Sequence, residues 1–392
     1  MPARPKDAQE DRSDGDTAHG DTAHGEQKNE GETCRAVTVQ PGEKGSGRLD
    51  RIAVERPGPG QVLLRVLRVG ICGTDAEIDA GLYGAPPPGH TRLVLGHESQ
   101  VRVEAVGPDA RGLQPGQLAV AIVRRPCPGP CPPCANGRWD LCVTGEYRER
   151  GIMHLDGFLR EHLVEDAPFV VPVPEELEAV SVLLEPLSVV EKAIAEAERV
   201  RDPAAPPARR ALVTGGGPIG LLAGLALRQR GLEVWLLDRR GPESPKGRLA
   251  AAAGMRYVDD SATPIERVAD VGRFDLAVEA TGFAPLVFRS LALLERNGTL
   301  VLTGVTSGHR TVSVDANAVN ASMVLESQVM IGSVNAARRH YEQAIHDLGD
   351  WRARWPGLVE RLITARYPLE RFRDALAPSS EDIKRVVEVT VG

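Results

Sequence analysis

The sequence has no long hydrophobic run, few aromatic residues and no excess of basic charge. No apolar stretch reaches the ~20 residues that a membrane span needs, which favours a water-soluble protein. The first residues lack the apolar segment of a secretory signal and are too acidic for a transit peptide, so we expect a cytoplasmic location. The formal net charge is −7, which disfavours nucleic acid as a partner.

Hydrophobic residues make up 42% of the 392 residues, enough for a substantial core and for two domains of ordinary size. The first 33 residues are different. Nine acidic and four basic side chains give them −5 of the net charge, and Asp-Thr-Ala-His-Gly at 16–20 is repeated at 21–25. We predict a disordered tail over residues 1–33, which is favoured over metal binding by His19 and His24.

Two kinds of pattern follow the tail. Residues 34–187 contain short β-type segments separated by Gly and Pro, which predicts a compact β-barrel-like unit with strands at 61–69, 101–106 and 117–123. From residue 188, apolar runs alternate with helical stretches, which is typical of a parallel sheet with helices on both faces. The strands expected there are 211–213, 232–237, 274–278 and 300–302, the helices 188–200, 219–230 and 285–295, and the C-terminal part adds a helix at 341–348 and a strand at 385–391.

A glycine motif lies between the first strand of this second region and the helix expected over 219–230. Gly215-Gly216-Gly217-Pro218-Ile219-Gly220 fits G-x-G-x-x-G. Gly215 permits a tight turn, Gly217 lets a pyrophosphate approach the backbone, and Gly220 lets helix and strand pack closely. The N-terminus of the helix, at Pro218 and Ile219, offers free N–H groups to phosphate. Dinucleotide binding is therefore favoured over a purely structural turn.

Asp238, Arg239 and Arg240 follow the next strand and bear on the choice of dinucleotide. A carboxylate at this place accepts hydrogen bonds from the ribose diol of NAD, whereas arginines would neutralise the 2′-phosphate of NADP. Having both predicts tolerance of either cofactor, and a solvated surface turn is the alternative.

Four of the six cysteines are clustered at Cys127, Cys131, Cys134 and Cys142 in a loop rich in Pro and Gly. Thiolates at such spacings in a loop that can curl predict a closed tetrahedral zinc site with a structural role.

A second set of metal-binding residue types is dispersed along the chain. Cys72 and Thr74 lie in Gly-Ile-Cys-Gly-Thr-Asp, His97 and Glu98 in Gly-His-Glu, and Glu185 follows at the junction of the two regions. Thiolate, imidazole and carboxylate together suit a catalytic zinc with an open position. On the spacing alone, ordinary packing roles for Cys72 and His97 remain an equal alternative.

Taken together, these motifs resemble the zinc-dependent medium-chain dehydrogenase/reductase family over residues 35–392, and most closely its glucose 1-dehydrogenase branch. The resemblance implies an α/β fold with a GroES-like catalytic domain over 34–187 and 336–392, and a doubly wound Rossmann domain over 188–335. It also implies two zinc ions per chain, one catalytic and one structural, and NAD or NADP as cofactor.

The resemblance further implies roles for individual residues. Cys72, His97, Glu98 and Glu185 would hold the catalytic zinc, and Thr74 would connect the substrate hydroxyl to a proton relay. The sugar would contact Thr74, Glu149, Glu185 and Asn335, and the cofactor would also lie along Thr303, Gly304, Val305, Ser333, Val334 and Asn335.

The implied activity is oxidation of an aldose to a lactone by hydride transfer, by an enzyme that forms a dimer or tetramer of identical chains. Val123 and Val189 stand where this branch carries Asn and Asp that contact sugar, so polar partners would be lost there. The alternatives are a dehydrogenase of a cyclitol, sugar alcohol or amino sugar, and a non-catalytic dinucleotide-binding protein of the same fold.

Overall fold

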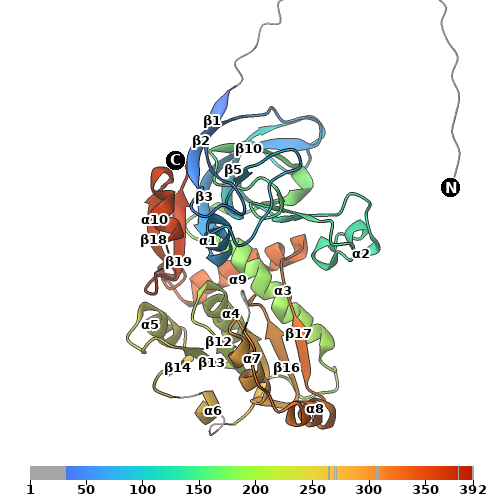
Figure 1. Ribbon diagram of the computed structural model, residues 1–392, viewed down its shortest axis with the longest axis vertical. Helices are drawn as coiled ribbons and strands as arrows, with labels where there is room; N and C mark the ends of the chain where they lie inside the picture. The colour runs from blue at the N-terminus through green and yellow to red at the C-terminus, as the bar shows by residue number, and fades with distance from the viewer. Residues whose placement is uncertain are drawn as a thin grey trace, which may run out of the picture.

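The computed structural model describes residues 32–390 except 264, 269, 271, 306–309 and 378, so nearly all of the predicted tail lies outside the described residues. Two lobes are stacked one above the other, with the helices α3 (Leu184–Val200) and α9 (Arg338–Arg354) between them (Figure 1). In the described part of the chain, no helix is long and apolar enough to cross a membrane.

The first lobe is built on a seven-stranded sheet in which β3 is the central strand. The sheet has the order β11-β6-β5-β3-β19-β18, and β10 also pairs with β3. Two smaller sheets, β2-β1-β4 and β7-β8-β9, flank it. The strands are β1 (Thr33–Val39), β2 (Arg48–Ala53), β3 (Gln61–Ile71), β4 (Leu93–Val94), β5 (Glu98–Val106), β6 (Leu118–Ala121), β7 (Arg124–Arg125), β8 (Arg148–Arg150), β9 (His154–Leu155), β10 (His162–Asp166), β11 (Val170–Pro172), β18 (Ile363–Pro368) and β19 (Lys384–Glu388). Its short helices are α1 (Gly73–Asp79), α2 (Pro132–Ala135) and α10 (Phe372–Leu376).

The second lobe is a doubly wound parallel sheet of six strands in the order β14-β13-β12-β15-β16-β17. The order reverses direction between β12 and β15, which is where such sheets bind nucleotides. The strands are β12 (Arg210–Thr214), β13 (Glu233–Asp238), β14 (Arg256–Asp259), β15 (Phe274–Glu279), β16 (Leu294–Leu302) and β17 (Val329–Gly332). The helices are α4 (Pro218–Gln229), α5 (Pro245–Ala252), α6 (Ile265–Val268), α7 (Ala284–Leu291) and α8 (Ala316–Leu325).

Alternate side chains of the central strands enter two separate cores. Val213 of β12 faces the core formed with α3, α4, α5 and α9, whereas Leu212 faces the core formed with α6 and α7. This alternation is the two-residue repeat of a strand, and it places helices on both faces of the sheet. The predicted fold class is confirmed.

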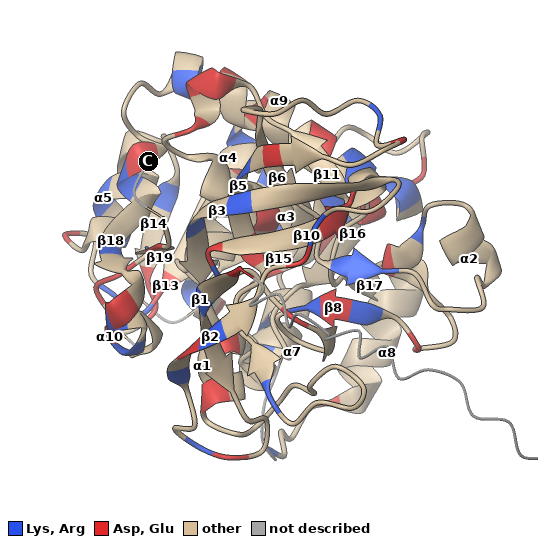
Figure 2. Ribbon diagram, turned by 90° about the horizontal axis from the view of Figure 1, so that it is seen from above, with Lys and Arg blue, Asp and Glu red and all other residues tan. Residues whose placement is uncertain are grey.

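The chain passes from the first lobe to the second and back. One buried core joins the two, because Leu118 and Val120 of β6 belong to the same cluster as α3, α4 and α9. After residue 335 the chain returns through α9 to β19, which pairs antiparallel with β3. The residue limits of the two domains stay a prediction. Seen from above, acidic and basic residues are interspersed along the ribbon (Figure 2).

Most of the expected elements are present, although several have other bounds. The helix expected over 341–348 spans Arg338–Arg354, and the strand expected over 385–391 ends at Glu388. The helix predicted over 285–295 ends at Leu291, because Leu293 and Leu294 turn into the core and β16 begins at Leu294. The strand predicted over 117–123 is shorter, Leu118–Ala121, and Arg124–Arg125 form a separate strand that pairs with β8.

Candidate active site

A cleft of about 740 Å³ lies between the two lobes, and most of the predicted site residues line it. From the first lobe it receives the dispersed set of metal-binding residue types, together with Glu149. From the second lobe it receives the glycine turn at Gly217 and the segments around Thr303 and Asn335. The lining includes Cys72, Thr74, His97, Glu98, Glu185, Glu149, Gly217, Pro218, Ile219, Thr303, Val305, Val334 and Asn335.

Cys72 and His97 are brought together by the pairing of β3 with β5. Cys72 follows the end of β3 and precedes α1, and His97 directly precedes β5. The distance from Cys72 Sγ to His97 Nε2 is 3.2 Å. Tetrahedral zinc bonds to sulfur and nitrogen hold the two ligand atoms about 3.5 Å apart. This donor pair therefore fits a zinc ion.

Asp75 orients both of these residues and was missed by the sequence analysis as a site residue. It is fully buried in the first turn of α1, and one carboxylate oxygen accepts from the backbone N of Cys72 at 2.9 Å. The other oxygen is 3.3 Å from His97 Nδ1. Fixing the far ring nitrogen leaves Nε2 directed at Cys72. The position of an acid three residues after Cys72 was the available signal.

Glu98 is paired with a residue that no sequence pattern indicated. Lys384 of β19 donates to its two carboxylate oxygens at 2.6 and 2.5 Å, and both side chains are almost fully buried. Gly70 of β3 gives the carboxylate its space, since a Cβ there would lie 2.1 Å from Glu98 Oε2. Oxygen atoms of Glu98 and Glu185 and a ring nitrogen of His97 still lie within 4.8 Å of one another.

Glu185 reaches the cleft from the first turn of α3 and is buried. Burial and the neighbouring Glu98 carboxylate raise the pKa of Glu185 to about 7, against the opposing effect of His97. Lys384 compensates only one of the three carboxylates, that of Glu98. Asp75 and Glu185, with an imidazole and a thiol in the same buried place, remain a costly arrangement without a further cation. The chemistry of the donor set is therefore that of a metal site.

Glu149 also lines the cleft, and it is held there by two donors. Its Oε1 accepts from Arg124 Nε at 3.0 Å and from Asn335 Nδ2 at 2.7 Å. Asn335 belongs to the segment after β17 and has a φ of 61°, a left-handed backbone that Asn tolerates better than most residues. This contact ties the first lobe to the second across the cleft.

The four clustered cysteines come together at the end of a protruding loop, apart from the cleft. Their sulfur atoms all lie within 4.8 Å of one another, with Cys131 Sγ 3.9 Å from Cys142 Sγ. Tetrahedral zinc–sulfur bonds of about 2.3 Å give sulfur–sulfur distances near 3.8 Å. The set therefore fits a closed zinc site. Trp139 anchors the loop against Phe169, with ring centroids 5.4 Å apart.

The glycine motif forms the turn between β12 and α4. Gly215 has a φ of 99°, and a Cβ at Gly220 would lie 1.7 Å from the carbonyl oxygen of Gly215. At Gly217 a Cβ would meet nothing within 4 Å, so the turn is open on the side where a phosphate would approach. Asp238 at the end of β13 accepts from the backbone N of Gly216 at 2.7 Å.

A neighbouring cavity of about 530 Å³ continues from this turn along the end of β13. Its lining includes Asp238, Arg239 and Arg240, as the sequence predicted, and adds the cations Lys246 and Arg310. Three of the predicted cofactor residues, Gly220, Gly304 and Ser333, line neither of these two cavities. Gly304 packs on Gly282, where a Cβ would come within 2.1 Å of the Gly282 nitrogen, and Ser333 is buried.

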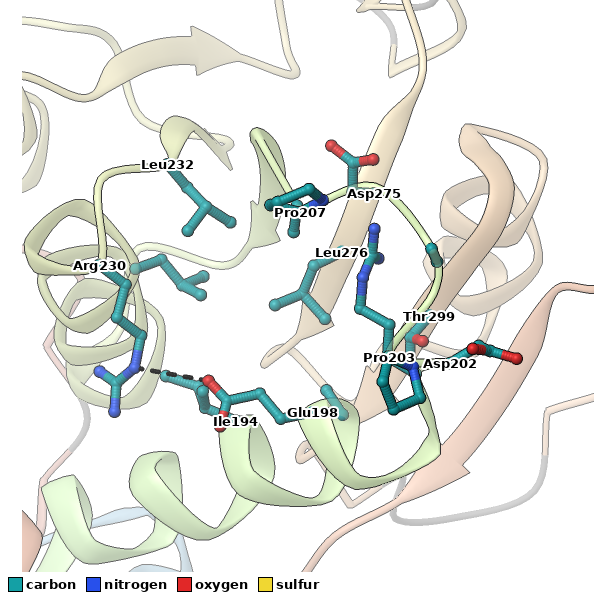
Figure 3. A pocket seen from close by; sticks show the side chains of 15 residues that line it. Ile194, Glu198, Asp202, Pro203, Pro207, Arg230, Leu232, Asp275, Leu276 and Thr299 are labelled. Atoms are coloured by element: carbon teal, nitrogen blue, oxygen red, sulfur yellow. Dashed lines mark ion pairs between the residues drawn. The ribbon is translucent and has the colours of Figure 1, made fainter.

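A third cavity, of about 460 Å³, lies at the opposite end of the parallel strands (Figure 3). Its walls are mainly aliphatic and proline side chains, among them Ile194, Pro207, Leu232 and Leu276. At its edge Arg230 forms an ion pair with Glu198. None of the predicted site residues lines this cavity, so we assign the active site to the cleft.

Comparison with known proteins agrees with this geometry. The family "Alcohol dehydrogenase GroES-like domain" matches residues 58–175, and the family "Glucose dehydrogenase C-terminus" matches residues 178–389. The chain belongs to the zinc-dependent medium-chain dehydrogenase/reductase family.

Individual proteins similar to this chain place it in one branch of this family. A glucose 1-dehydrogenase of Methanocella arvoryzae is 43% identical over 356 residues, covering 91% of this chain and 99% of that protein. One of Thermoproteus tenax is 40% identical over 362 residues, with the same coverage. A glucose dehydrogenase of Haloferax mediterranei, solved in complex with NADP, Zn and gluconolactone, has a TM-score of 0.83 at 33% identity and covers 91% of this chain and 100% of that one. The branch is that of the glucose dehydrogenases, so the predicted family and enzyme class are confirmed.

Proposed function

We propose that this protein oxidises the hemiacetal hydroxyl of glucose or a similar aldose to the lactone, with NADP⁺ or NAD⁺ as the oxidant and release of one proton. The observation that carries the proposal is the Cys72–His97 pair, 3.2 Å apart, facing the glycine turn across one cleft. The glucose dehydrogenases of Methanocella and Haloferax support the choice of sugar.

In this proposal Cys72 and His97 hold the catalytic zinc, with Glu98 or Glu185 as a further ligand. When bound, zinc supplies a Lewis acid for the substrate oxygen and the nicotinamide supplies the hydride acceptor. Asp75 fixes the ring of His97, and Lys384 restrains Glu98. The four clustered cysteines hold the second zinc and take no part in the reaction.

The remaining residues of the cleft bind and orient the sugar. Thr74, half-buried in the first turn of α1, is placed to pass the proton of the hydroxyl towards solvent. Glu149 has Oε2 available for a sugar hydroxyl, because Arg124 and Asn335 both donate to Oε1. Val334 and Asn335 both line the cleft. In this proposal their segment lies along the nicotinamide, and the Asn335 side chain also contacts the sugar.

The cofactor would lie with its diphosphate at the glycine turn and its adenosine in the cavity beside β13. Arg239, Arg240, Lys246 and Arg310 give that cavity four cations, and Asp238 already accepts from the backbone N of Gly216 and of Arg240. We therefore expect a preference for NADP⁺. Arg239→Ala should raise the KM for NADP⁺ by roughly tenfold and leave that for NAD⁺ nearly unchanged. Equal effects on both cofactors would contradict this preference.

The proposed activity is tested by following cofactor reduction with glucose, galactose, xylose, inositol and sorbitol, each with NADP⁺ and with NAD⁺. We expect turnover with at least one aldose and a lactone as product. Cys72→Ala should abolish turnover and remove one of two zinc ions per chain while NADP⁺ still binds. Oxidation of none of these compounds, or full activity of the Cys72 variant, would overturn the proposal.

A cyclitol, sugar alcohol or amino sugar is the second candidate substrate, because Val123 and Val189 both line the cleft. An apolar wall offers no partner to the hydroxyls that lie against it. Val123→Asn should then raise kcat/KM for glucose more than for sorbitol. A larger gain for sorbitol, or faster wild-type turnover of inositol than of any aldose, would favour the second candidate.

We also propose that the protein forms a homodimer through the edge of the parallel sheet. Within the described part of the chain, β17 has a neighbouring strand on one side only, and the adjoining helix α8 has no buried residue. Val324 and Leu325 of α8 are 67% and 73% exposed. An unpaired strand edge beside exposed aliphatic side chains suits a second copy. Leu325→Glu should convert the dimer to a monomer, as measured by light scattering.

We also propose a cytoplasmic location, since a thiolate metal site requires reduced cysteines.

A further inference from the structure

A buried lysine joins the cysteine loop to the cleft. Lys192 lies on α3, two turns after Glu185, and is 3% exposed. Its ammonium donates to the carbonyl oxygen of Val334 at 2.8 Å and lies 3.5 Å from Asp140 Oδ2. A buried ammonium is unfavourable unless a carboxylate and further hydrogen bonds compensate it, so this position is defined by those partners.

Of the two partners of Lys192, Asp140 belongs to the cysteine loop and Val334 belongs to the segment that lines the cleft. Asp140 is buried in the cysteine loop, two residues before Cys142, and its carbonyl oxygen also accepts from Lys192 at 3.4 Å. Val334 lines the cleft and is followed by Asn335, whose left-handed backbone places its amide on Glu149. The ammonium therefore lies between the zinc-binding loop and the segment that would contact the nicotinamide.

We propose, on the basis of the function proposed above, that Lys192 is a positioning residue for the cofactor segment 333–335, and that Asp140 makes this position depend on an intact cysteine loop. Without the ammonium, the Val334 carbonyl loses the donor that holds it. The segment then relaxes, and the Asn335 amide moves from Glu149. The loop thus affects cofactor binding without touching the cofactor.

A second ion pair of the same loop supplies a matched control. Arg138 contacts Glu196 on the next turn of α3 at 3.4 Å and Asp140 at 3.2 Å. Arg138 therefore helps to dock the loop on α3, while the contact to the cofactor segment is made by Lys192. Arg138→Met removes this one ion pair with α3, while Lys192 still holds both Asp140 and the Val334 carbonyl.

The test compares Lys192→Met, Lys192→Arg and Arg138→Met, each with two zinc ions per chain confirmed by metal analysis. The dissociation constant of NADP⁺ is measured by calorimetry without sugar, and kcat and KM are measured with glucose. Lys192→Met should weaken NADP⁺ binding roughly ten- to hundredfold, as expected for a hydrogen bond from a charged donor. Lys192→Arg should recover part of this loss, and Arg138→Met should bind within about twofold of the wild type.

Equal weakening by the Lys192→Met and Arg138→Met variants, or unchanged binding in Lys192→Met, would overturn the proposal. If Lys192→Met does not fold, Asp140→Asn tests the same link, and unchanged NADP⁺ binding in that folded variant would also overturn it. Because binding is measured without sugar, wild-type protein that binds NADP⁺ and oxidises no sugar would refute the proposed function alone.

Discussion

Replacing Lys384 with methionine should destabilise the protein more than replacing almost any surface charge. Lys384 and Glu98 have side-chain exposures of 1% and 2%, and the ammonium contacts both carboxylate oxygens. Burial alone would lower the pKa of Lys384, but Glu98 raises it above its ordinary value, so Lys384 carries its positive charge at neutral pH. The methionine variant would leave the Glu98 carboxylate buried without its cation.

Breaking a buried ion pair by removing one partner costs about 3–5 kcal/mol. An exposed pair is worth about 0.2–1 kcal/mol. The pair Arg289–Glu266, with side-chain exposures of 34% and 63%, is a suitable control on the other lobe. The Lys384→Met variant should therefore lose several times more stability than Arg289→Met.

Urea unfolding of the zinc-loaded protein, followed by tryptophan fluorescence, measures both losses. Lys384→Arg should lie between the wild type and Lys384→Met, because it keeps the charge but changes its shape. In Glu98→Gln, the further replacement of Lys384 by methionine should cost less than in the wild type. A loss below about 1 kcal/mol for Lys384→Met, equal to that of the surface control, would refute the assignment of a stabilising buried pair.

Three further changes test other parts of the molecule. Gly220→Ala should abolish NADP⁺ binding in calorimetry, since its Cβ would lie 1.7 Å from the Gly215 carbonyl oxygen, and unchanged affinity would refute the tight turn. Cys131→Ser should lower the zinc content from two ions per chain to one with Cys72 still metal-bound, and two retained ions would refute the four-thiolate site. Burial lowers the pKa of His340 to about 3. The unfolded chain therefore binds the extra proton below pH ~6.5, and stability falls there by up to ~1.4 kcal/mol per pH unit. His340→Gln should flatten that slope in pH-dependent melting, and an unchanged slope would contradict a neutral buried imidazole.

The parts of the site that the sequence predicted are local in the chain. The glycine turn occupies 215–220 and the cysteine loop 127–142. Because each is one short segment, the spacing of its residues is enough to predict the turn or the metal site. The change of hydrophobic pattern near residue 186 predicted two lobes, and the parallel sheet expected in the second one is present from β12 onwards. The helix expected over 285–295 was too long. Two apolar residues such as Leu293 and Leu294 fit either the continuation of a helix or the start of a strand, so the pattern does not show where the helix ends.

The parts that were missed depend on contacts between distant segments. Lys384 is 286 residues from Glu98, and the two meet because β19 pairs with β3 after the chain returns from the second lobe. Lys192 is 142 residues from Val334 and 52 from Asp140. A lysine in a helical stretch ordinarily predicts a solvated face, so its burial follows from tertiary structure alone.

Helix α3 holds the candidate catalytic cluster, the cysteine loop and the cofactor segment 333–335 at fixed distances from one another. Glu185 in its first turn reaches the candidate catalytic cluster, and Lys192 and Glu196 meet the cysteine loop on later turns. Seven residues of helix span about 10.5 Å, so the cluster and the loop are set apart by a rigid spacer. The same lysine holds the carbonyl oxygen of Val334 in the segment that lines the cleft. A displacement of the loop relative to α3 would therefore act on the cofactor segment through Lys192, while the cluster at Glu185 stays in place.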